Sequence, residues 1–260
     1  MKISVLTENC AGSHFQAEHG LSYLIEIDNE KILFDTGHSD VFLKNARKLG
    51  INIHKEVEKV VVSHGHWDHA YGLKYLKNKT VITHPRSLDR MLATEEFKDV
   101  RLNLTPQELE EKFNLQPVKA PQNITENLIF LGEIPRANDF ESQSTYFTDE
   151  RGNEDFIPDD SALVATIGNE LIIITGCSHS GICNISEYAK LVTGISDVKA
   201  ILGGFHLKEK DEQTEKTIEY FKKHQVDKMY PSHCTQLPAL SAFYEAFNTQ
   251  QLKTGMVLEF

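Results

Sequence analysis

The sequence predicts an α/β protein in which two β-sheets lie between layers of helices. Three observations support this fold class. Short apolar runs typical of strands open the chain, a well-defined hairpin begins near residue 161, and strands are followed by helices in each half. The first half contains these predicted elements in order: strands in 1–8 and 21–35, a helix in 39–50, a strand in "VEKVVVSHGH", a helix in "DHAYGLKYLK", and a strand and turn in "TVITHP".

The second half becomes regular only after residue 158. Residues 85–158 are polar and mixed, although Thr105 and Glu108 have the spacing of a capping box at a helix start. We therefore expect one domain over residues 1–260, with 85–158 as an irregular elaboration or lid. "SALVATI-GN-ELIIIT" then predicts a hairpin closed by a two-residue turn. The elements predicted after it are "SGICNISEYAKLV" (helix), "VKAILGGF" (strand), "DEQTEKTIEYFKKHQ" (helix), "VDKMYPSH" (strand), "LPALSAFYEAF" (helix) and "GMVLEF" (strand).

Composition excludes several classes of function. The net charge of −11 argues against a nucleic-acid-binding surface, which needs clustered Lys and Arg. No apolar run approaches the roughly 18 residues of a membrane span. Four cysteines in a chain of 260 residues do not indicate a disulfide framework, and the N-terminal "MKISVLTENC" has no apolar signal block. We therefore expect a cytoplasmic protein; these facts bound its class but predict neither its function nor its oligomeric state.

The motif "SHGHWDH" places His64, His66, Asp68 and His69 directly after an apolar strand. In an extended loop, residues i and i+2 point to the same side, so His64 and His66 can share one metal ion. Asp68 and His69 begin the next helix and point elsewhere, which suits a second ion. Imidazole and carboxylate ligands fit Zn²⁺, or Fe or Mn. Three His and one Asp in such a short stretch therefore predict a metal site rather than solvated loop residues.

This motif resembles the signature of the metallo-β-lactamase superfamily. "ILFDTG" and "YPSHC" resemble its early turn and its final His motif. "AEHGLSYLIE", "FDTGHS", "GCSHSG", "GGFHL" and "SHCT" resemble, in this order, the branch of ribofuranosyl-aminobenzene phosphate synthase-like (dihydropterin-type) proteins. The resemblance implies a four-layer αβ/βα sandwich of two mixed β-sheets flanked by helices, with a dinuclear metal site. It also implies that Asp35 supports a ligand and that His233 binds the second metal.

The chain departs from the common family pattern around its hairpin. Asp159 and Asp160 stand where a His is expected, and Cys177 stands where a bridging Asp is expected. If Gly168 and Asn169 form the turn, Asp160 and Cys177 lie opposite each other at the open end. We expect His179 to fill a metal position. Asp160 or Asp159 is a candidate ligand or orienting residue, and Cys177 is either a thiolate ligand or a small buried residue.

Other residues near these motifs are weaker candidates. Cys183 is expected in the core, and Cys234 is expected to point away from the site if His233 points in. Glu18 and His19 in "AEHG" are possible substrate-binding residues on the family resemblance alone. His206, at a strand end, can contact substrate or metal or can be a capped loop residue.

Two divalent ions in open coordination lower the pKa of a bound water and polarise an ester oxygen. The sequence therefore predicts a metal-dependent hydrolase of a small-molecule ester, with a phosphoester ahead of a lactone or thioester. Asp68 would also act catalytically on the attacking water. An anionic substrate is compatible with the acidic chain because the ions offset its charge locally. The alternatives are an iron-dependent oxidoreductase or dioxygenase on the same fold, and a metal-bound binding protein without turnover.

Overall fold

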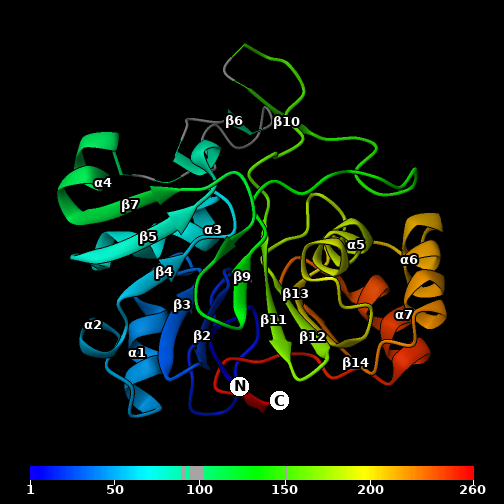
Figure 1. Cartoon of the computed structure of the whole chain (residues 1–260), viewed down its shortest axis with the longest axis horizontal. Helices are drawn as coiled ribbons and strands as arrows, with labels where there is room; N and C mark the ends of the chain where they lie inside the picture. Colours follow the sequence, from blue (N-terminus) through cyan, green and yellow to red (C-terminus); the bar gives the residue numbers. More distant parts are fainter. Residues whose placement is uncertain (89–91, 94–101, 103, 150) are drawn as a thin grey trace. The chain divides into compact units, whose positions relative to one another are not determined.

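The computed structural model describes residues 1–88, 92–93, 102, 104–149 and 151–260. This part of the chain divides into two compact units, whose elements are labelled in Figure 1. The first unit consists of Met1–Lys119, Tyr146–Asp155 and Lys253–Phe260, and the second consists of Ala120–Thr145 and Phe156–Leu252. That the whole chain is a single domain stays a prediction.

The first unit is built on a seven-stranded mixed sheet with the order β15-β1-β2-β3-β4-β5-β7. β1, β2 and β3 pair antiparallel, whereas β3, β4, β5 and β7 run parallel. β15 pairs antiparallel with β1, so that the two chain ends are joined in one sheet. The strands are β1 (Lys2–Thr7), β2 (Ser22–Ile27), β3 (Glu30–Phe34), β4 (Lys59–Val61), β5 (Lys79–Thr83), β7 (Phe113–Pro117) and β15 (Val257–Glu259).

Helices of the first unit pack on this sheet through a buried apolar cluster. Phe42 and Ala46 of one helix contact sheet residues such as Leu24 and Leu33 in that cluster. The predicted capping box is confirmed, because Thr105 and Glu108 hydrogen-bond each other's backbone N–H groups. The helical elements are α1 (Val41–Lys48), α2 (Ile53–Glu56), α3 (Trp67–Ala70), η1 (Tyr71–Tyr75), η2 (Pro85–Leu88) and α4 (Pro106–Lys112).

The second unit contains a six-stranded mixed sheet with the order β14-β13-β12-β11-β9-β8. Its strands are β8 (Gln122–Asn123), β9 (Leu128–Phe130), β11 (Ala162–Ile167), β12 (Glu170–Thr175), β13 (Val198–Gly204) and β14 (Lys228–Ser232). Its helices, labelled in Figure 1, are α5 (Ile182–Thr193), α6 (Glu212–Lys223) and α7 (Leu237–Phe247). They share a buried apolar cluster with these strands. The predicted fold class, two mixed sheets flanked by helices, is confirmed.

The predicted hairpin register is confirmed as well. Ile167 pairs with Glu170, and the ladder continues to Ala162 opposite Thr175. Beyond that end, the Asp160 carboxylate accepts a hydrogen bond from the Ser180 N–H at 2.9 Å. β12, β13 and β14 run parallel, so their carboxyl ends and the loops that follow them lie at one edge of the sheet.

The segment 85–158, predicted to be irregular, contributes strands to both sheets. β7 extends the first sheet beside β5, and β9 lies beside β11 in the second. Two further short strands of this segment, β6 (Leu92–Ala93) and β10 (Phe147–Thr148), pair antiparallel with each other. Residues 89–91, 94–101, 103 and 150 of this segment lie outside the described residues. Its role as a lid stays a prediction.

A buried carboxylate anchors the loop before β10 to helix α5. Glu141 is 1% exposed and accepts hydrogen bonds from the N–H groups of Cys183 and Asn184, both at 2.9 Å. The Glu141 carboxylate therefore accepts hydrogen bonds from two of the N–H groups in the first turn of α5, which have no partner within the helix. Burial raises the pKa of Glu141, and this effect outweighs its hydrogen bonds with Cys183, Asn138 and Asn184.

This raised pKa predicts a pH-dependent stability. Above the ordinary Glu value of 4.5, the unfolded chain releases the Glu141 proton while the folded chain retains it, so the free energy of unfolding falls as pH rises toward the folded pKa. Glu141→Gln removes this contribution. We expect the stability of the wild type relative to Glu141→Gln to decrease as pH rises from 4.5, measured by urea unfolding across that range. A constant difference would contradict the assignment.

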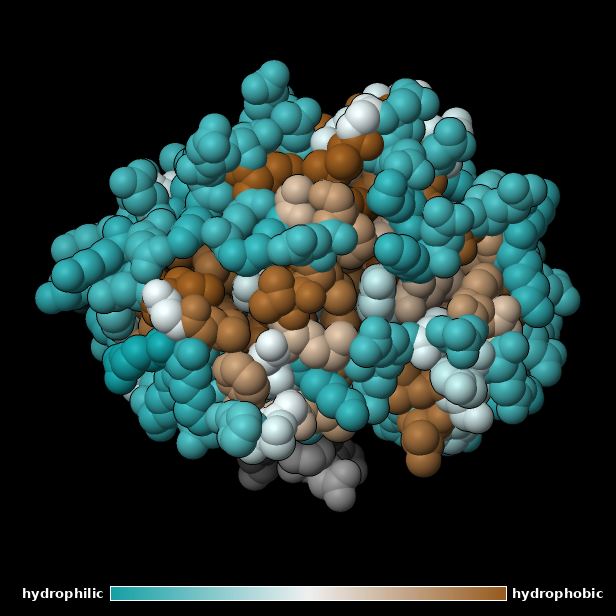
Figure 2. All heavy atoms as spheres, turned by 90° about the horizontal axis from the view of Figure 1, so that it is seen from below, coloured by the Kyte–Doolittle hydropathy of each residue, from teal (hydrophilic) through white to brown (hydrophobic). Residues whose placement is uncertain are grey.

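Hydrophilic residues, teal in Figure 2, cover much of the face shown there, and apolar residues in brown are exposed between them. The large exposed apolar side chains include Leu191, Leu237 and Tyr244. Within the described residues, none of the helices has both the length and the apolar character needed to cross a membrane.

Candidate metal centre

The loop after β4 carries the His-rich motif in the first unit. His64 and His69 are fully buried, and His66 and Asp68 are 5% and 7% exposed. Asp68 and His69 belong to the first turn of α3, as the sequence predicts. The Nε2 atom of His64 lies 3.0 Å from the Nδ1 atom of His66. Two imidazole nitrogens on one tetrahedral zinc ion are about 3.3 Å apart, so this pair has the spacing of ligands that share an ion.

Asp35, at the end of β3, holds this loop in place. Its carboxylate accepts hydrogen bonds from the N–H and hydroxyl groups of Ser63 at 2.7 and 2.8 Å. Its Oδ2 atom lies 2.6 Å from Nδ1 of His69. A carboxylate on one ring nitrogen fixes the tautomer of a histidine and directs the other nitrogen toward a metal. The geometry is that of a carboxylate that orients a ligand, which is the role that the family resemblance implies for Asp35.

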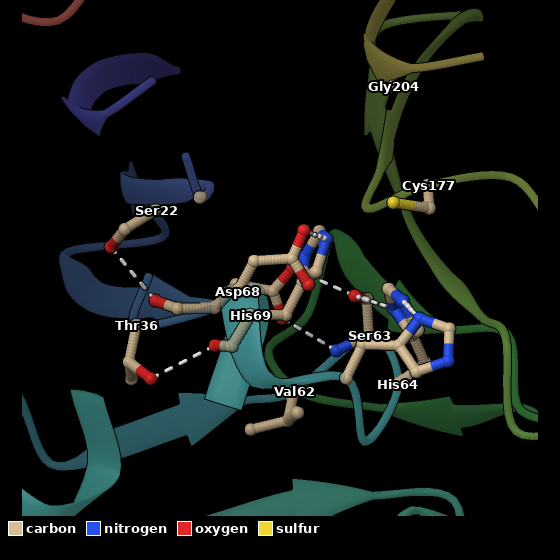
Figure 3. Close-up of polar contacts among 12 residues, drawn as sticks. Ser22, Thr36, Val62, Ser63, His64, Asp68, His69, Cys177 and Gly204 are labelled. Atoms are coloured by element: carbon tan, nitrogen blue, oxygen red, sulfur yellow. Dashed lines mark hydrogen bonds and ion pairs between the residues drawn. The ribbon is translucent and has the colours of Figure 1, made fainter. Parts of the chain in front are cut away.

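Backbone hydrogen bonds tie α3 to the loop after β3. Thr36 donates its N–H and its hydroxyl to the carbonyl oxygen of His69 at 2.7 and 2.9 Å, and Figure 3 shows the hydroxyl contact. The hydroxyl of Ser22 donates to the carbonyl oxygen of Asp35 at 2.9 Å. Gly65 lies against the backbone of Ser87, where an added Cβ would be 2.6 Å from the Ser87 carbonyl oxygen. The segment that carries the histidines is therefore held by backbone hydrogen bonds and by close packing.

Asp68 faces a cluster of rings in the same unit. Its Oδ2 atom lies 3.2 Å from Nε2 of His19, a side chain that is 54% exposed. The His19 and Trp67 rings are 5.3 Å apart, and His38 meets Trp67 edge-on at 4.7 Å. Glu18 accepts hydrogen bonds from the N–H groups of His38 and Ser39 at 3.0 and 3.1 Å. Glu18 thus binds the backbone of the 38–39 loop, whereas the ring of His19 contacts the carboxylate of Asp68.

The second unit carries its candidate residues at the carboxyl ends of its parallel strands. Cys177 and His179 follow β12, His206 follows β13, and His233 and Cys234 follow β14. The His179 and His206 rings lie 4.3 Å apart. Ligand atoms of Cys177, His206 and Cys234 all lie within 4.8 Å of one another. Carboxyl ends of parallel strands are the usual place for ligands in α/β sheets.

Asp160 supports the turn that carries His179. It is fully buried, and besides the Ser180 N–H it interacts with the backbone of His179. Burial raises the pKa of Asp160 despite these hydrogen bonds. Asp160 thus contacts the 177–181 turn. Both roles given to it from the sequence, a direct ligand and an orienting residue, stay predictions.

Two cysteine expectations have different outcomes. Cys183 is 1% exposed and packs in the apolar cluster of the second unit, as expected. Cys234 does not point away: its Sγ atom lies 3.4 Å from the carbonyl oxygen of Cys177. The reason is the left-handed backbone of His233, with φ of 52°, which turns the chain between these neighbours. Burial raises the pKa of the Cys234 thiol, but interactions with Cys177 and His206 outweigh it, so this pKa lies well below its usual value.

Sequence reasoning missed Ser63 and Gly204. Ser63 contacts Asp35 through both its N–H and its hydroxyl, and its hydroxyl also lies 2.9 Å from Nδ1 of His64. Gly204 leaves room for the Cys234 thiol, since an added Cβ would be 2.5 Å from its Sγ atom. A serine directly before "HGH" and a glycine pair before "FH" were the only signals, and neither has a meaning without the fold.

The donor set fits a divalent metal ion. In the first unit it consists of three imidazoles and one carboxylate, all buried, with one imidazole held by Asp35. Imidazole and carboxylate groups match the ligand preference of zinc, and less strongly that of iron and manganese. His179 and His233, which the sequence also predicts as ligands, lie in the second unit after β12 and β14.

Comparison with known proteins gives the family. Residues 16–193 match the metallo-beta-lactamase superfamily. An uncharacterized protein of Methanocaldococcus jannaschii is 35% identical over 270 residues, which cover 98% of this chain and 99% of that protein. The 7,8-dihydropterin-6-methyl-4-(beta-D-ribofuranosyl)-aminobenzene-5'-phosphate synthase of the same organism is 34% identical over 285 residues, covering 100% of this chain and 97% of the synthase.

A solved structure supports the same relationship. The crystal structure of Tm1679, described as a metal-dependent hydrolase of the beta-lactamase superfamily, superimposes with a TM-score of 0.88 and 34% identity. The match covers 100% of this chain and 99% of Tm1679. These comparisons agree with the His-rich motif: the superfamily model matches most of the chain, and two relatives and one solved structure match nearly all of it. The chain belongs to the metallo-β-lactamase superfamily.

Proposed function

We propose that the protein is a metal-dependent hydrolase of a small-molecule ester, with a phosphoester as the favoured substrate. The observation that carries this proposal is the buried pair of His64 and His66, whose facing nitrogens are 3.0 Å apart. The proposed ligands are His64, His66, Asp68 and His69 of the first unit and His179 and His233 of the second. We propose two divalent ions, with zinc favoured over iron and manganese.

Bound divalent ions would bring a water molecule to ionise near neutral pH and would polarise an ester oxygen. Asp68 would accept a hydrogen bond from the attacking water and then its proton. His19, 3.2 Å from the Asp68 carboxylate and partly exposed, is placed to pass that proton to solvent. Asp35, on Nδ1 of His69, would leave the other ring nitrogen free to hold a metal ion. This division of roles needs no serine or cysteine nucleophile.

Two points favour a phosphoester over a lactone or thioester. The name of the synthase relative refers to a 5'-phosphate compound, and that relative matches the whole chain. In addition, divalent ions attract an anionic substrate to an otherwise acidic protein with a net charge of −11. The substrate proposed is therefore a small phosphorylated compound.

His66→Ala should lower the metal content by at least one ion per chain, because it removes one of two facing ligands. The measurement is elemental analysis of the purified protein, together with rates on a panel of phosphoesters and lactones. The matched control is His54→Ala, which changes an exposed histidine on α2 and should leave both unchanged.

The same measurements can contradict the proposal. Unchanged metal content in His66→Ala would show that the ligand assignment is wrong. One iron per chain together with oxygen consumption would replace the hydrolase with an oxidoreductase or dioxygenase. Full metal content with no turnover of any ester would favour a binding protein.

A further inference from the structure

Three neighbouring parallel strands of the second unit each carry a metal-binding side chain at the same position. β12, β13 and β14 end at Thr175, Gly204 and Ser232. Cys177, His206 and Cys234 each follow two residues later. Because the strands are adjacent and parallel, this shared offset brings one donor from each strand to the same edge of the sheet.

The three donors lie close together. The sulfur atoms of Cys177 and Cys234 and a ring nitrogen of His206 are all within 4.8 Å of one another. Ligand atoms around a tetrahedral zinc ion are about 3.3–3.8 Å apart, given zinc bond lengths of about 2.3 Å to sulfur and 2.0 Å to nitrogen. Side-chain rotations that move each donor by less than about 1 Å would therefore complete a coordination shell. Cys177 is 4% exposed, whereas His206 and Cys234 are partly exposed, which leaves an ion a path to the site.

The backbone around these residues permits the three donor side chains to lie close together. Gly204 has no Cβ, and an added one would lie 2.5 Å from Cys234 Sγ and 2.6 Å from the Gly176 carbonyl oxygen. His206 adopts a left-handed backbone conformation with φ of 52°. Such conformations are costly for residues other than glycine and cluster at functional sites.

We infer that Cys177, His206 and Cys234 of the second unit form a site for a thiophilic divalent ion, with zinc as its natural occupant. Two thiolates and one imidazole are the donor set that zinc favours, and the fourth position is open to water or a substrate group. None of these residues belongs to the six ligands proposed for the hydrolytic centre. The ion joins the three loops that carry His179, His206 and His233, and it therefore stabilises the folded state by binding to it.

Cadmium is the probe for this site, because its bonds to thiolates give an ultraviolet charge-transfer absorption. Reduced, chelator-treated protein is titrated with CdCl₂. We expect the band in the wild type and in Cys183→Ser, whose thiol is buried elsewhere in the apolar core. Cys177→Ser and Cys234→Ser should each lose at least half of the absorption, and the double variant should lose all of it. Circular dichroism and the Tm establish that each variant is folded.

A second measurement does not depend on substitutions. Cadmium should protect Cys234 of the wild type from alkylation while Cys10, which is similarly half-buried, still reacts. Equal alkylation of both residues, or a band unchanged in the Cys177→Ser and Cys234→Ser double variant, would overturn the inference. A Cys177–Cys234 disulfide that forms in the metal-free protein and persists in the presence of cadmium would overturn it as well.

The experiment separates this inference from the hydrolase proposal. A His64→Ala and His66→Ala double variant should keep the cadmium band, because its substitutions lie outside the site. Loss of the band in that variant would overturn the assignment of the band to these three donors. Failure of esterase activity in the wild type would leave the cadmium result unaffected.

Discussion

Replacing Asp68 with asparagine is expected to lower kcat/KM for the phosphoester substrate by about 10²–10⁴-fold, the usual contribution of a positioned proton acceptor. The amide is nearly isosteric, and Asp68 is 7% exposed, so the packing of α3 changes little. The loss of negative charge removes both the proton acceptor and the partner of His19 Nε2. The measurement is steady-state kinetics on the best substrate of the panel.

The control for this variant is Asp227→Asn, which makes the same chemical change at an exposed position of the second unit. It should keep wild-type kinetics. Elemental analysis then separates the two roles of Asp68, because a variant that keeps its metal but loses activity has lost the proton acceptor. Unchanged kinetics in Asp68→Asn would contradict the mechanism.

Asp35→Ala is expected to lower the free energy of unfolding by about 3–5 kcal/mol, the usual cost of removing one member of a buried polar pair. The reason is that Asp35 is fully buried and contacts two groups of Ser63 and one of His69. Metal affinity should also fall by about 10–100-fold, because the ring of His69 loses the carboxylate that orients it. Urea unfolding and competition with a chelator measure the two effects.

Asp35→Asn separates stability from metal binding. The amide keeps the volume and can still accept one hydrogen bond from Ser63, so its stability should lie between that of Asp35→Ala and the wild type. The metal affinity of Asp35→Asn should fall nearly as far as that of Asp35→Ala, because His69 no longer has a negatively charged carboxylate beside its ring. Asp227→Ala provides the baseline for an exposed Asp. Wild-type metal affinity in Asp35→Asn would contradict the proposed orienting role.

Local patterns predicted the parts of this protein that depend on neighbours in the sequence. The hairpin at Gly168–Asn169 fixes its own register, because a two-residue turn leaves only one pairing of the flanking strands. Thr105 and Glu108 interact across one helical turn. The His-rich motif fits in six residues at a strand end, so its metal-binding character is visible without the fold.

The segment 85–158 shows the limit of this reasoning. Polar and mixed composition predicted irregular structure, yet β7 and β9 are sheet strands. β7 is an edge strand with only two apolar alternating residues, Phe113 and Leu115, and β9 is only three residues long, so each leaves too short a pattern to predict a strand from sequence. Glu141, which anchors this segment to α5 over about forty residues, left no local signal.

The sequence by itself determined the candidate metal motif, the hairpin register and the α/β class, because each rests on spacing along a short stretch of chain. The family resemblance implied a supporting role for Asp35, but only the tertiary structure decided which groups Asp35 contacts. Asp35 meets Ser63 and His69 because β3 and β4 run side by side. Cys177, His206 and Cys234 meet because three parallel strands end at one edge of a sheet, and strand pairing over such distances is set by the packing of the whole unit rather than by local sequence.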